Sequence, residues 1–202
     1  MGFGLGGEEL PDPGSWVFVV GPSGSGKDTL LAGAREQLTK DGSFVFARRY
    51  ITRPDTAGGE DHISVSVAEF DHMAEQELFI LHWQAHGLKY GISKRYEDAR
   101  QSGHNIVVNV SRQVITPSRQ QFTNLKIIVV TASRENLARR LASRGRESIL
   151  DIQSRLSHPG PAFMNGHDVI TVDNNGTPAE GVTLFVHALR SSVTDPLQAG
   201  IA

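Results

Sequence analysis

Short runs of apolar residues alternate along the chain with segments of helical periodicity. The first run, Trp16–Val20, is rich in β-branched and aromatic residues and stops abruptly at Gly21. A run of this kind that ends at a turn residue predicts a buried strand. Similar runs cover residues 106–110, 126–131 and, more weakly, 168–172, and helical patterns cover residues 29–39, 96–102, 134–143 and 148–157. Since strands that alternate with helices form a parallel sheet covered on both faces, we expect an α/β protein.

Residues 44–92 depart from this alternation. They contain short alternating pieces, glycines near a turn at Gly58, Gly59 and Gly87, and a local cluster of aromatic residues. We therefore expect an inserted lobe of mixed strands above the carboxyl edge of the parallel sheet. The predicted organisation is a flexible tail over 1–15, a single domain over 16–190 with a lid region at 134–158, and a second tail over 191–202.

The composition narrows the function classes. A length of 202 residues with 39% apolar and 21% charged residues fits one globular domain. The chain has no cysteine, which excludes a disulfide framework and a thiolate metal site. A net charge of −2 argues against a general nucleic-acid binder, and no apolar run is long enough to span a bilayer. The first residues also lack the pattern of a secretory signal, so we expect a cytoplasmic protein without nucleic-acid or membrane partners.

The strongest chemical signal is the segment Gly21–Thr29, which reads Gly-Pro-Ser-Gly-Ser-Gly-Lys-Asp-Thr. It starts where the first strand ends and leads into the first helical pattern, the context that a Walker A phosphate-binding loop requires. The glycines let backbone N–H groups point inward, and the helix presents its positive end to phosphates. Lys27 adds a cation for the β- and γ-phosphates of ATP, which makes it a catalytic candidate. The residues expected to bind ATP here are Gly21, Ser23, Gly24, Ser25, Gly26, Lys27, Asp28 and Thr29.

The residue after the lysine departs from this motif. Asp28 stands where a serine or threonine hydroxyl would bind Mg²⁺. A carboxylate can bind Mg²⁺ directly or through water. Alternatively, Thr29 supplies the hydroxyl and Asp28 only begins the helix, where an acidic side chain suits the helix dipole. We favour Asp28 as the metal-linked residue.

Two further segments concentrate cationic side chains. Residues 139–147 read Arg-Arg-Leu-Ala-Ser-Arg-Gly-Arg-Glu, and Arg155 follows on the next helical pattern. Several guanidinium groups around one glycine are typical of a lid that closes over a transferred phosphoryl group. Residues 48–54 and 83–91 place arginine and tyrosine donors beside glycine-rich turns, as in a phosphate clamp. Because the chain lacks the Asn-Lys-x-Asp segment of GTPases and is short for an ATPase machine, these features predict a small-molecule kinase.

In order and spacing, these motifs resemble the guanylate kinase family over about residues 16–190. The resemblance rests on the phosphate loop, Thr52-Arg53, Phe79 to Trp83, His86-Gly87 through Tyr90-Gly91, and Arg144-Gly145 with Arg155. It implies a P-loop core with an acceptor-binding lobe and an arginine lid. It also implies the roles of individual residues: Lys27, Arg144 and Arg155 on the ATP phosphates, Arg53 and Tyr90 on the acceptor's phosphate, and Asn174 and Asn175 near the adenine.

Several positions differ from the guanylate kinase pattern. Thr56 replaces a second arginine, His82 replaces the glutamate that reads guanine, and Ile92 replaces a hydroxyl residue. Loss of that carboxylate removes the group that makes the pocket specific for guanine. With these changes the chain looks like the ribose 1,5-bisphosphate phosphokinase family, whose members transfer the γ-phosphoryl group of ATP to ribose 1,5-bisphosphate. This resemblance implies 5-phospho-α-D-ribose 1-diphosphate as the product and a link to phosphonate breakdown.

The implied chemistry suits the residues present. An acceptor phosphate oxygen is already anionic at neutral pH, so positioning and charge neutralisation by Mg²⁺, Lys27 and the arginines would suffice. Two phosphates on the acceptor would explain additional cations, and the substrate-binding candidates are Arg53, Tyr90, Arg49, His82 and Arg146. Two alternatives stay open: a nucleoside monophosphate kinase with a rearranged base pocket, and a non-catalytic guanylate-kinase-like interaction module.

Overall fold

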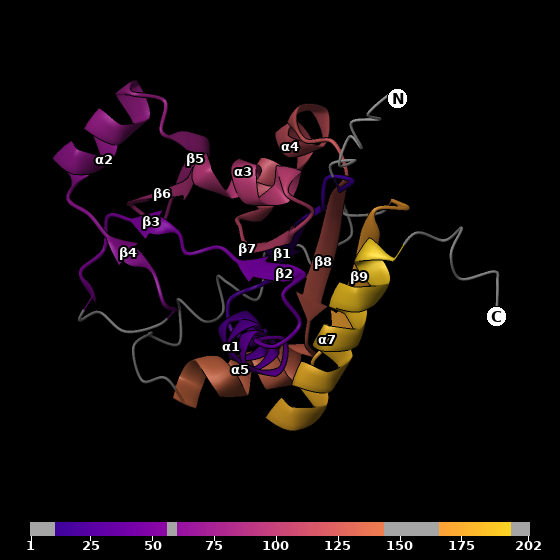
Figure 1. The fold of residues 1–202 in the computed structure, drawn as a ribbon. Coiled ribbons are helices and arrows are strands. Elements are labelled where there is room, and N and C mark those ends of the chain that lie inside the picture. The colour runs from indigo at the N-terminus through magenta and orange to yellow at the C-terminus, as the bar shows by residue number, and fades with distance from the viewer. Residues whose placement is uncertain (1–10, 56–59, 144–165, 195–202) are drawn as a thin grey trace, which may run out of the picture.

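The computed structural model describes residues 11–55, 60–143 and 166–194 of the chain. Its centre is a parallel five-stranded sheet with the strand order β2-β7-β1-β8-β9 (Figure 1). In chain order these strands are β1 (Trp16–Val20), β2 (Phe44–Phe46), β7 (Asn105–Asn109), β8 (Leu125–Thr131) and β9 (Val169–Asp173). In the central register Phe18 lies opposite Val108 on one side and Ile127 on the other. The predicted α/β class with a parallel sheet is confirmed.

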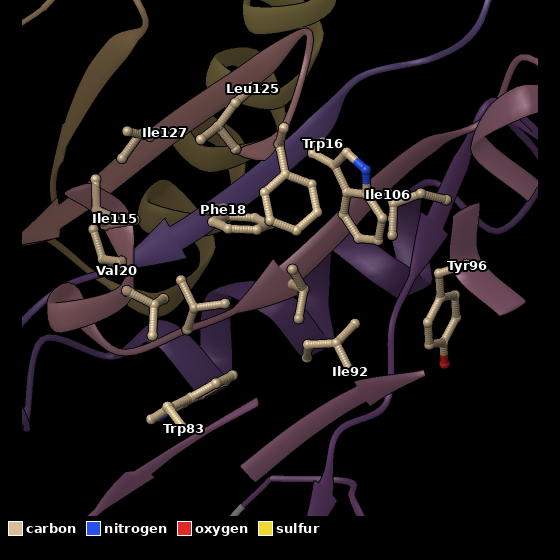
Figure 2. Packing of buried hydrophobic residues seen from close by; sticks show 14 of the residues in the cluster. Trp16, Phe18, Val20, Trp83, Ile92, Tyr96, Ile106, Ile115, Leu125 and Ile127 are labelled. Carbon is tan, nitrogen blue, oxygen red and sulfur yellow. The ribbon is translucent and has the colours of Figure 1, made fainter. Parts of the chain in front are cut away.

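Alternate residues of β1 pack on opposite faces of the sheet, because successive side chains of a strand point to opposite sides. Trp16, Phe18 and Val20 belong to one buried cluster, which also contains Tyr96 of α3 (Arg95–Gln101) and Ile115 of α4 (Ile115–Gln121) (Figure 2). Val17 and Val19 belong to a second buried cluster with α1 (Lys27–Gln37) and α7 (Pro178–Val193). Burial on both faces explains why β1 is apolar at every position.

A second sheet forms the lobe that the sequence predicts between the early strands. Its strands are β3 (Tyr50–Ile51), β4 (Ile63–Ser64), β5 (Phe79–Ala85) and β6 (Leu88–Ser93), in the order β4-β3-β6-β5, and α2 (Val67–Glu75) packs beside them. β5 and β6 form a hairpin whose two-residue turn is His86-Gly87, with φ values of 52° and 73°. Two consecutive positive φ angles are what a type I′ hairpin turn requires.

The lobe is anchored to the core by two of its own apolar side chains. Trp83 of β5 and Ile92 of β6 are buried in the cluster that contains Val20, the last residue of β1 (Figure 2). Hydrogen bonds reinforce this contact: the amide of Gln113 donates to the carbonyl oxygen of Gln84 at 2.6 Å. The lobe is therefore held at the carboxyl end of the parallel sheet.

Three boundaries in the structure differ from those expected from the sequence. The strand Phe44–Phe46 pairs with β7 in the central sheet, so the lobe sheet itself begins only at Tyr50. The segment before β1 is attached at its end, because the backbone N–H of Gly14 donates to the carbonyl oxygen of Arg100 at 2.9 Å. α7 continues past residue 190 to Val193.

Helix α5 (Arg134–Ser143) occupies the first part of the expected lid region, whose remainder lies outside the described residues. The expected helix at 148–157 lies outside them as well. Within the described ranges, none of the helices combines the length and the hydrophobicity needed to cross a membrane.

Candidate active site

The loop between β1 and α1 adopts the conformation that phosphate binding needs. Gly24 and Gly26 have φ values of 84° and 90°, in the left-handed region that favours glycine. Gly26 is the N-cap of α1, and no described side chain caps this end of the helix. A Cβ on Gly26 would lie 2.4 Å from Nδ2 of Asn174, so glycine is also required for space. The first N–H groups of α1 are thus left to a ligand, and a helix N-terminus of this kind favours an anion.

Lys27 curls back over this loop. Its Nζ donates to the carbonyl oxygens of Gly21 and Pro22, at 2.8 and 3.0 Å. Burial lowers the pKa of Lys27 to about 8, opposed by nearby Asp28 and reinforced by Arg49. A phosphate group at this point would add negative charge beside the buried ammonium group and favour its protonated form.

The loop, β7 and the lobe enclose a cavity of about 400 Å³ at the carboxyl end of the sheet. Its cationic lining consists of Lys27, Arg49, Arg53 and Arg112. The other residues that line it are Gly21, Pro22, Ser23, Gly24, Gly26, Asp28, Glu60, Trp83, Ala85, His86, Tyr90, Asn109, Val110 and Ser111. Ligands of α/β proteins bind at this end of the strands, so this is the candidate active site.

Asp28 and Thr29 take different positions relative to this cavity. Asp28 lines it, and its Oδ1 lies 3.4 Å from Nδ2 of Asn109 at the end of β7. Thr29 instead lines a smaller cavity of about 230 Å³ together with Arg140 and Asn174. Within the described ranges, no group of three or more His, Asp or Glu side chains forms a ready-made metal cage. One carboxylate beside a phosphate site nevertheless fits Mg²⁺, which commonly takes one or two protein carboxylates together with substrate phosphates.

Arg49 is a buried cation in the wall of the cavity. Its side chain forms an ion pair with Glu60, and the residue is only 8% exposed. Its guanidinium carbon lies 5.0 Å from the ring centroid of Tyr90 and 5.8 Å from that of Trp83. The two rings stack on each other at 5.3 Å. Cation–π contact and the ion pair thus fix this guanidinium in one place.

Tyr90 and Arg53 lie in the same wall. Burial raises the pKa of the Tyr90 hydroxyl, although Arg49 and Arg53 act in the opposite direction, so the phenol stays neutral at pH 7. The backbone carbonyl oxygen of Arg53 accepts from Ser64 Oγ at 2.7 Å and lies 3.1 Å from Nε2 of His62. Two side chains thus fix the backbone that carries Arg53 at the cavity. The structure therefore brings Arg49, Arg53 and Tyr90 together with Lys27, as the sequence analysis expects.

His82 does not join this group. It lies on β5 with an exposed side chain, and its ring contacts Phe70 and Phe79 at centroid distances of 6.5 and 6.3 Å. It does not line the large cavity, so the expected substrate contact is not supported. Side chains alternate along a strand, and Trp83, the next residue, takes the inward position. Ile92, a second changed position, is buried in the hydrophobic core, and the third, Thr56, lies outside the described residues.

Asn174 and Asn175 support the phosphate loop and its surroundings. The Asn174 side chain donates to the carbonyl oxygen of Ser25 at 2.7 Å, and Arg140 of α5 donates to the carbonyl oxygen of Asn174 at 2.8 Å. Oδ1 of Asn175 accepts from the backbone N–H of Ser133 at 2.8 Å. Asn174 also lines the smaller cavity beside Gly24, Gly26 and Thr29, whereas Asn175 does not. Both residues thus stabilise the backbone around the phosphate loop through hydrogen bonds, a role that the sequence alone does not indicate.

Three of the expected arginines, Arg144, Arg146 and Arg155, lie outside the described residues. The cavity is also lined by Glu60 and Asn109, which the sequence does not include among the expected ATP-binding, substrate-binding or metal-binding residues. Asn109 ends a parallel strand, a position from which side chains reach a ligand, and this signal was present in the sequence. Glu60 belongs to the segment 58–62 of the expected acceptor lobe, but the sequence alone does not indicate that its side chain lines the cavity.

Comparison with solved structures shows the fold. A guanylate kinase from Anaplasma phagocytophilum superposes with a TM-score of 0.66 at 20% sequence identity, covering 93% of this chain and 90% of that one. A gluconokinase from Sinorhizobium meliloti gives a TM-score of 0.52 at 17% identity, covering 94% and 99%. Both likenesses concern the arrangement of the elements alone.

Comparison of sequences goes further. A family model described as an AAA domain matches residues 17–155. The ribose 1,5-bisphosphate phosphokinase PhnN of Brucella melitensis is 44% identical over 176 residues, which are 87% of this chain and 92% of that protein. Its namesake in Rhizobium etli is 46% identical, over 83% of this chain and 85% of that protein.

A longer relative shares the same region. The bifunctional ribose 1,5-bisphosphokinase-thymidine phosphorylase of Azorhizobium caulinodans is 45% identical over 87% of this chain, which spans 25% of that protein's length. Since the similarity covers most of this chain and of the shorter relatives, the chain belongs to the ribose 1,5-bisphosphate phosphokinase family.

Proposed function

We propose that this protein transfers the γ-phosphoryl group of ATP to the 1-phosphate of ribose 1,5-bisphosphate, giving ADP and 5-phospho-α-D-ribose 1-diphosphate. The observation that carries the proposal is the cavity in which Lys27 of the phosphate loop faces the same space as Arg49, Arg53 and Tyr90. Family membership supplies the identity of the acceptor. The expected place of this reaction is phosphonate breakdown, as the family resemblance implies.

The reaction needs positioning more than proton transfer. An oxygen of the 1-phosphate forms a bond to the γ-phosphorus while the bond from that phosphorus to the β–γ bridging oxygen breaks, and ADP leaves with the electron pair. The attacking oxygen is already anionic, so no general base is required. Lys27 would bind the β- and γ-phosphates, and the helix N-terminus at Gly26 would hold the same anion through backbone N–H groups. ATP binding would extend over Gly21, Ser23, Gly24 and Ser25.

Two neighbouring cavities would bind the two substrates. The cavity lined by Thr29, Arg140 and Asn174 lies on the phosphate loop and is the proposed place of the adenosine end of ATP. The larger cavity would take the acceptor, with Arg53 and Tyr90 on one phosphate and Arg49 reinforcing the cationic wall. Arg144 and Arg155 would complete the charge neutralisation from the lid, and Arg146 would contact the substrate or the lid.

Mg²⁺ is the proposed cofactor. Asp28 would hold it, directly or through water, because this carboxylate lines the cavity beside Lys27 whereas Thr29 does not. When bound, Mg²⁺ would neutralise charge on the β- and γ-phosphate oxygens. Asn109 would keep the Asp28 carboxylate in place through its amide.

The proposal is tested by measuring ADP release from Mg-ATP with a panel of acceptors: ribose 1,5-bisphosphate, ribose 5-phosphate, GMP, AMP and gluconate. We expect turnover with ribose 1,5-bisphosphate at a kcat/KM at least 10²-fold above that with any other acceptor. Preferential turnover of GMP would favour the nucleoside monophosphate kinase alternative. Absence of turnover with every acceptor would favour the non-catalytic binding module.

A further inference from the structure

An acidic side chain lies in a cavity whose other charged groups are mainly cations. Glu60 lines the cavity with Lys27, Arg49 and Arg53, and its side chain is only 16% exposed. A carboxylate near a phosphate site opposes anion binding unless its charge is compensated. The ion pair with Arg49 supplies that compensation. Arg49 is held by two aromatic rings as well as by Glu60, and this ion pair occupies only one of the two carboxylate oxygens of Glu60.

The two oxygens of Glu60 have different neighbours. Oε1 pairs with Arg49, while Oε2 lies 3.5 Å from Nδ2 of Asn109. The same amide nitrogen is 3.4 Å from Oδ1 of Asp28. Both amide contacts are at the long limit of a hydrogen bond, so Oε2 keeps the capacity to accept a better donor.

These contacts place Glu60 between the two ends of the cavity. Asp28, beside the phosphate-loop lysine, contacts Asn109, and Asn109 contacts Glu60. Glu60 in turn pairs with Arg49, which lies against Tyr90. The middle of this series offers a carboxylate and an amide, which accept from and donate to hydroxyl groups. One end lies beside Lys27 and the other consists of Arg49 and Tyr90, the groups proposed to bind phosphates.

We propose that Glu60, together with Asn109, binds ring hydroxyl groups of the sugar acceptor and thereby selects ribose over 2-deoxyribose. This inference rests on the proposed function, because it takes the acceptor to be a sugar phosphate with phosphates at its ends. A carboxylate that accepts from a ribose 2-hydroxyl is the arrangement used in dinucleotide-binding sites. A site built to bond a hydroxyl group discriminates strongly against an analogue that lacks it, since the polar group is then left unpaired.

The test compares ribose 1,5-bisphosphate with 2-deoxyribose 1,5-bisphosphate as acceptors for the wild-type chain and for Glu60→Gln. We expect the wild type to favour ribose by at least 10²-fold in kcat/KM, and Glu60→Gln to reduce this preference to below about 10-fold. The loss should fall mainly on the ribose substrate. A wild type that accepts both sugars equally, or a variant that loses both activities in proportion, would overturn the inference. A proportional loss accompanied by a higher Mg²⁺ requirement would assign Glu60 to the metal instead.

Matched variants guard against a general effect on folding. Glu60→Asp keeps the charge opposite Arg49 but withdraws the oxygens, so its preference should fall between those of the wild type and Glu60→Gln. Asp61→Asn removes the neighbouring acid, which pairs with Arg35 and Arg48 outside the large cavity, and should keep the wild-type preference.

A binding measurement separates failure of this inference from failure of the proposed function. Calorimetric titration with ribose 5-phosphate and 2-deoxyribose 5-phosphate needs no turnover. Tighter binding of the ribose compound, lost in Glu60→Gln, would support hydroxyl recognition even if no acceptor were phosphorylated. Equal binding of both compounds to the wild type would overturn it even if ribose 1,5-bisphosphate proved to be the substrate.

Discussion

The side-chain amide of Asn174 donates to the backbone carbonyl oxygen of Ser25 at 2.7 Å, which ties the end of β9 to the phosphate loop. Asn174 is 5% exposed, and Arg140 of α5 donates to its carbonyl oxygen. The end of the last strand of the sheet and helix α5 therefore meet at the loop that would hold ATP. The hydrogen bond between Asn174 and Ser25 therefore restricts the conformation of the phosphate loop.

Asn174→Ala should weaken ATP binding more than acceptor binding. Removing the amide frees the Ser25 carbonyl group and loses a buried hydrogen bond, which costs roughly 1–3 kcal/mol. We expect the KM for ATP to rise about 10-fold, with the KM for the acceptor changed less than twofold. Steady-state kinetics with each substrate varied in turn checks this. Thr171→Ala, an exposed position on the same strand, is the matched control, and an equal rise of both KM values would contradict the assignment.

Lys27→Met should separate activity from stability. Loss of the cation from the phosphate loop should reduce kcat by roughly 10²-fold or more. The same change removes a charge whose burial is unfavourable. At pH 7 the free energy of unfolding of the ligand-free variant should therefore exceed that of the wild type by on the order of 2 kcal/mol, as measured by denaturant titration. Turnover at the wild-type rate would show that the active site lies elsewhere. A variant less stable than the wild type would contradict the account of the buried charge.

The pH dependence follows from the pKa of Lys27, which burial lowers from 10.5 to about 8. As pH rises through 8 the free protein loses this cation, so kcat/KM for ATP should fall above pH 8. Between pH 8 and 10.5 the unfolded chain holds the proton that the folded chain has lost, so the contribution of Lys27 to the free energy of unfolding should rise over this interval. Both trends should be absent in Lys27→Met. Denaturant titrations of the two proteins at pH 7.5 and 9.5, compared as a difference, measure the second trend.

Substitutions of Arg53 and His82 should affect the acceptor KM differently, although the sequence predicts that both residues contact the substrate. Arg53 lines the large cavity, so Arg53→Gln should raise the acceptor KM by at least 10-fold. His82 contacts Phe70 and Phe79 outside that cavity, so His82→Gln should leave both KM values within twofold of the wild type. A large effect at His82 would show that the lobe holds the acceptor in another arrangement.

Gly33 of α1 marks a close approach of two helices. A Cβ at this position would lie 2.5 Å from Cγ2 of Val182 on α7, closer than atoms can pack. Gly33→Ala should therefore destabilise the protein by about 1–3 kcal/mol, in spite of the better helix propensity of alanine. Val182→Ala removes the opposing methyl groups. In that background Gly33→Ala should therefore lower the free energy of unfolding much less than it does in the wild type. Chemical denaturation of all four proteins checks this cycle.

The sequence predicts the inner strands β1, β7 and β8 of the central sheet well because they are buried on both faces. Runs such as Trp16–Val20 are apolar throughout, and the phosphate loop follows in a fixed relation to the first of them. The sequence predicts the short strand Phe44–Phe46 as part of the lobe, whereas it pairs with β7, because three residues carry too little pattern to show which sheet they join. The start of α7 does carry a sequence signal, because Thr177 and Glu180 form a capping box with Pro178 at the first turn, but this signal is not part of the alternating pattern that predicts the other helices.

The candidate site likewise contains residues that the sequence predicts and residues that it does not. Lys27, Arg53 and Tyr90 follow from motifs with fixed spacing, and the structure places them around one cavity. His82 does not line the cavity because side chains alternate along β5, and its neighbour Trp83 takes the position that faces the cavity. Glu60 and Asn109 meet across 49 residues of sequence, a contact that depends on the packing of the lobe against β7 and that no local pattern specifies.

The central claim is that this cavity directs phosphoryl transfer to a sugar bisphosphate. Phosphorus NMR tests it most directly, with Mg-ATP and ribose 1,5-bisphosphate in one sample and Mg-ATP and GMP in another. We expect ADP together with a new pair of sugar diphosphate resonances in the first sample, and unchanged ATP in the second. Formation of GDP in the second sample, with the bisphosphate in the first left unchanged, would contradict it.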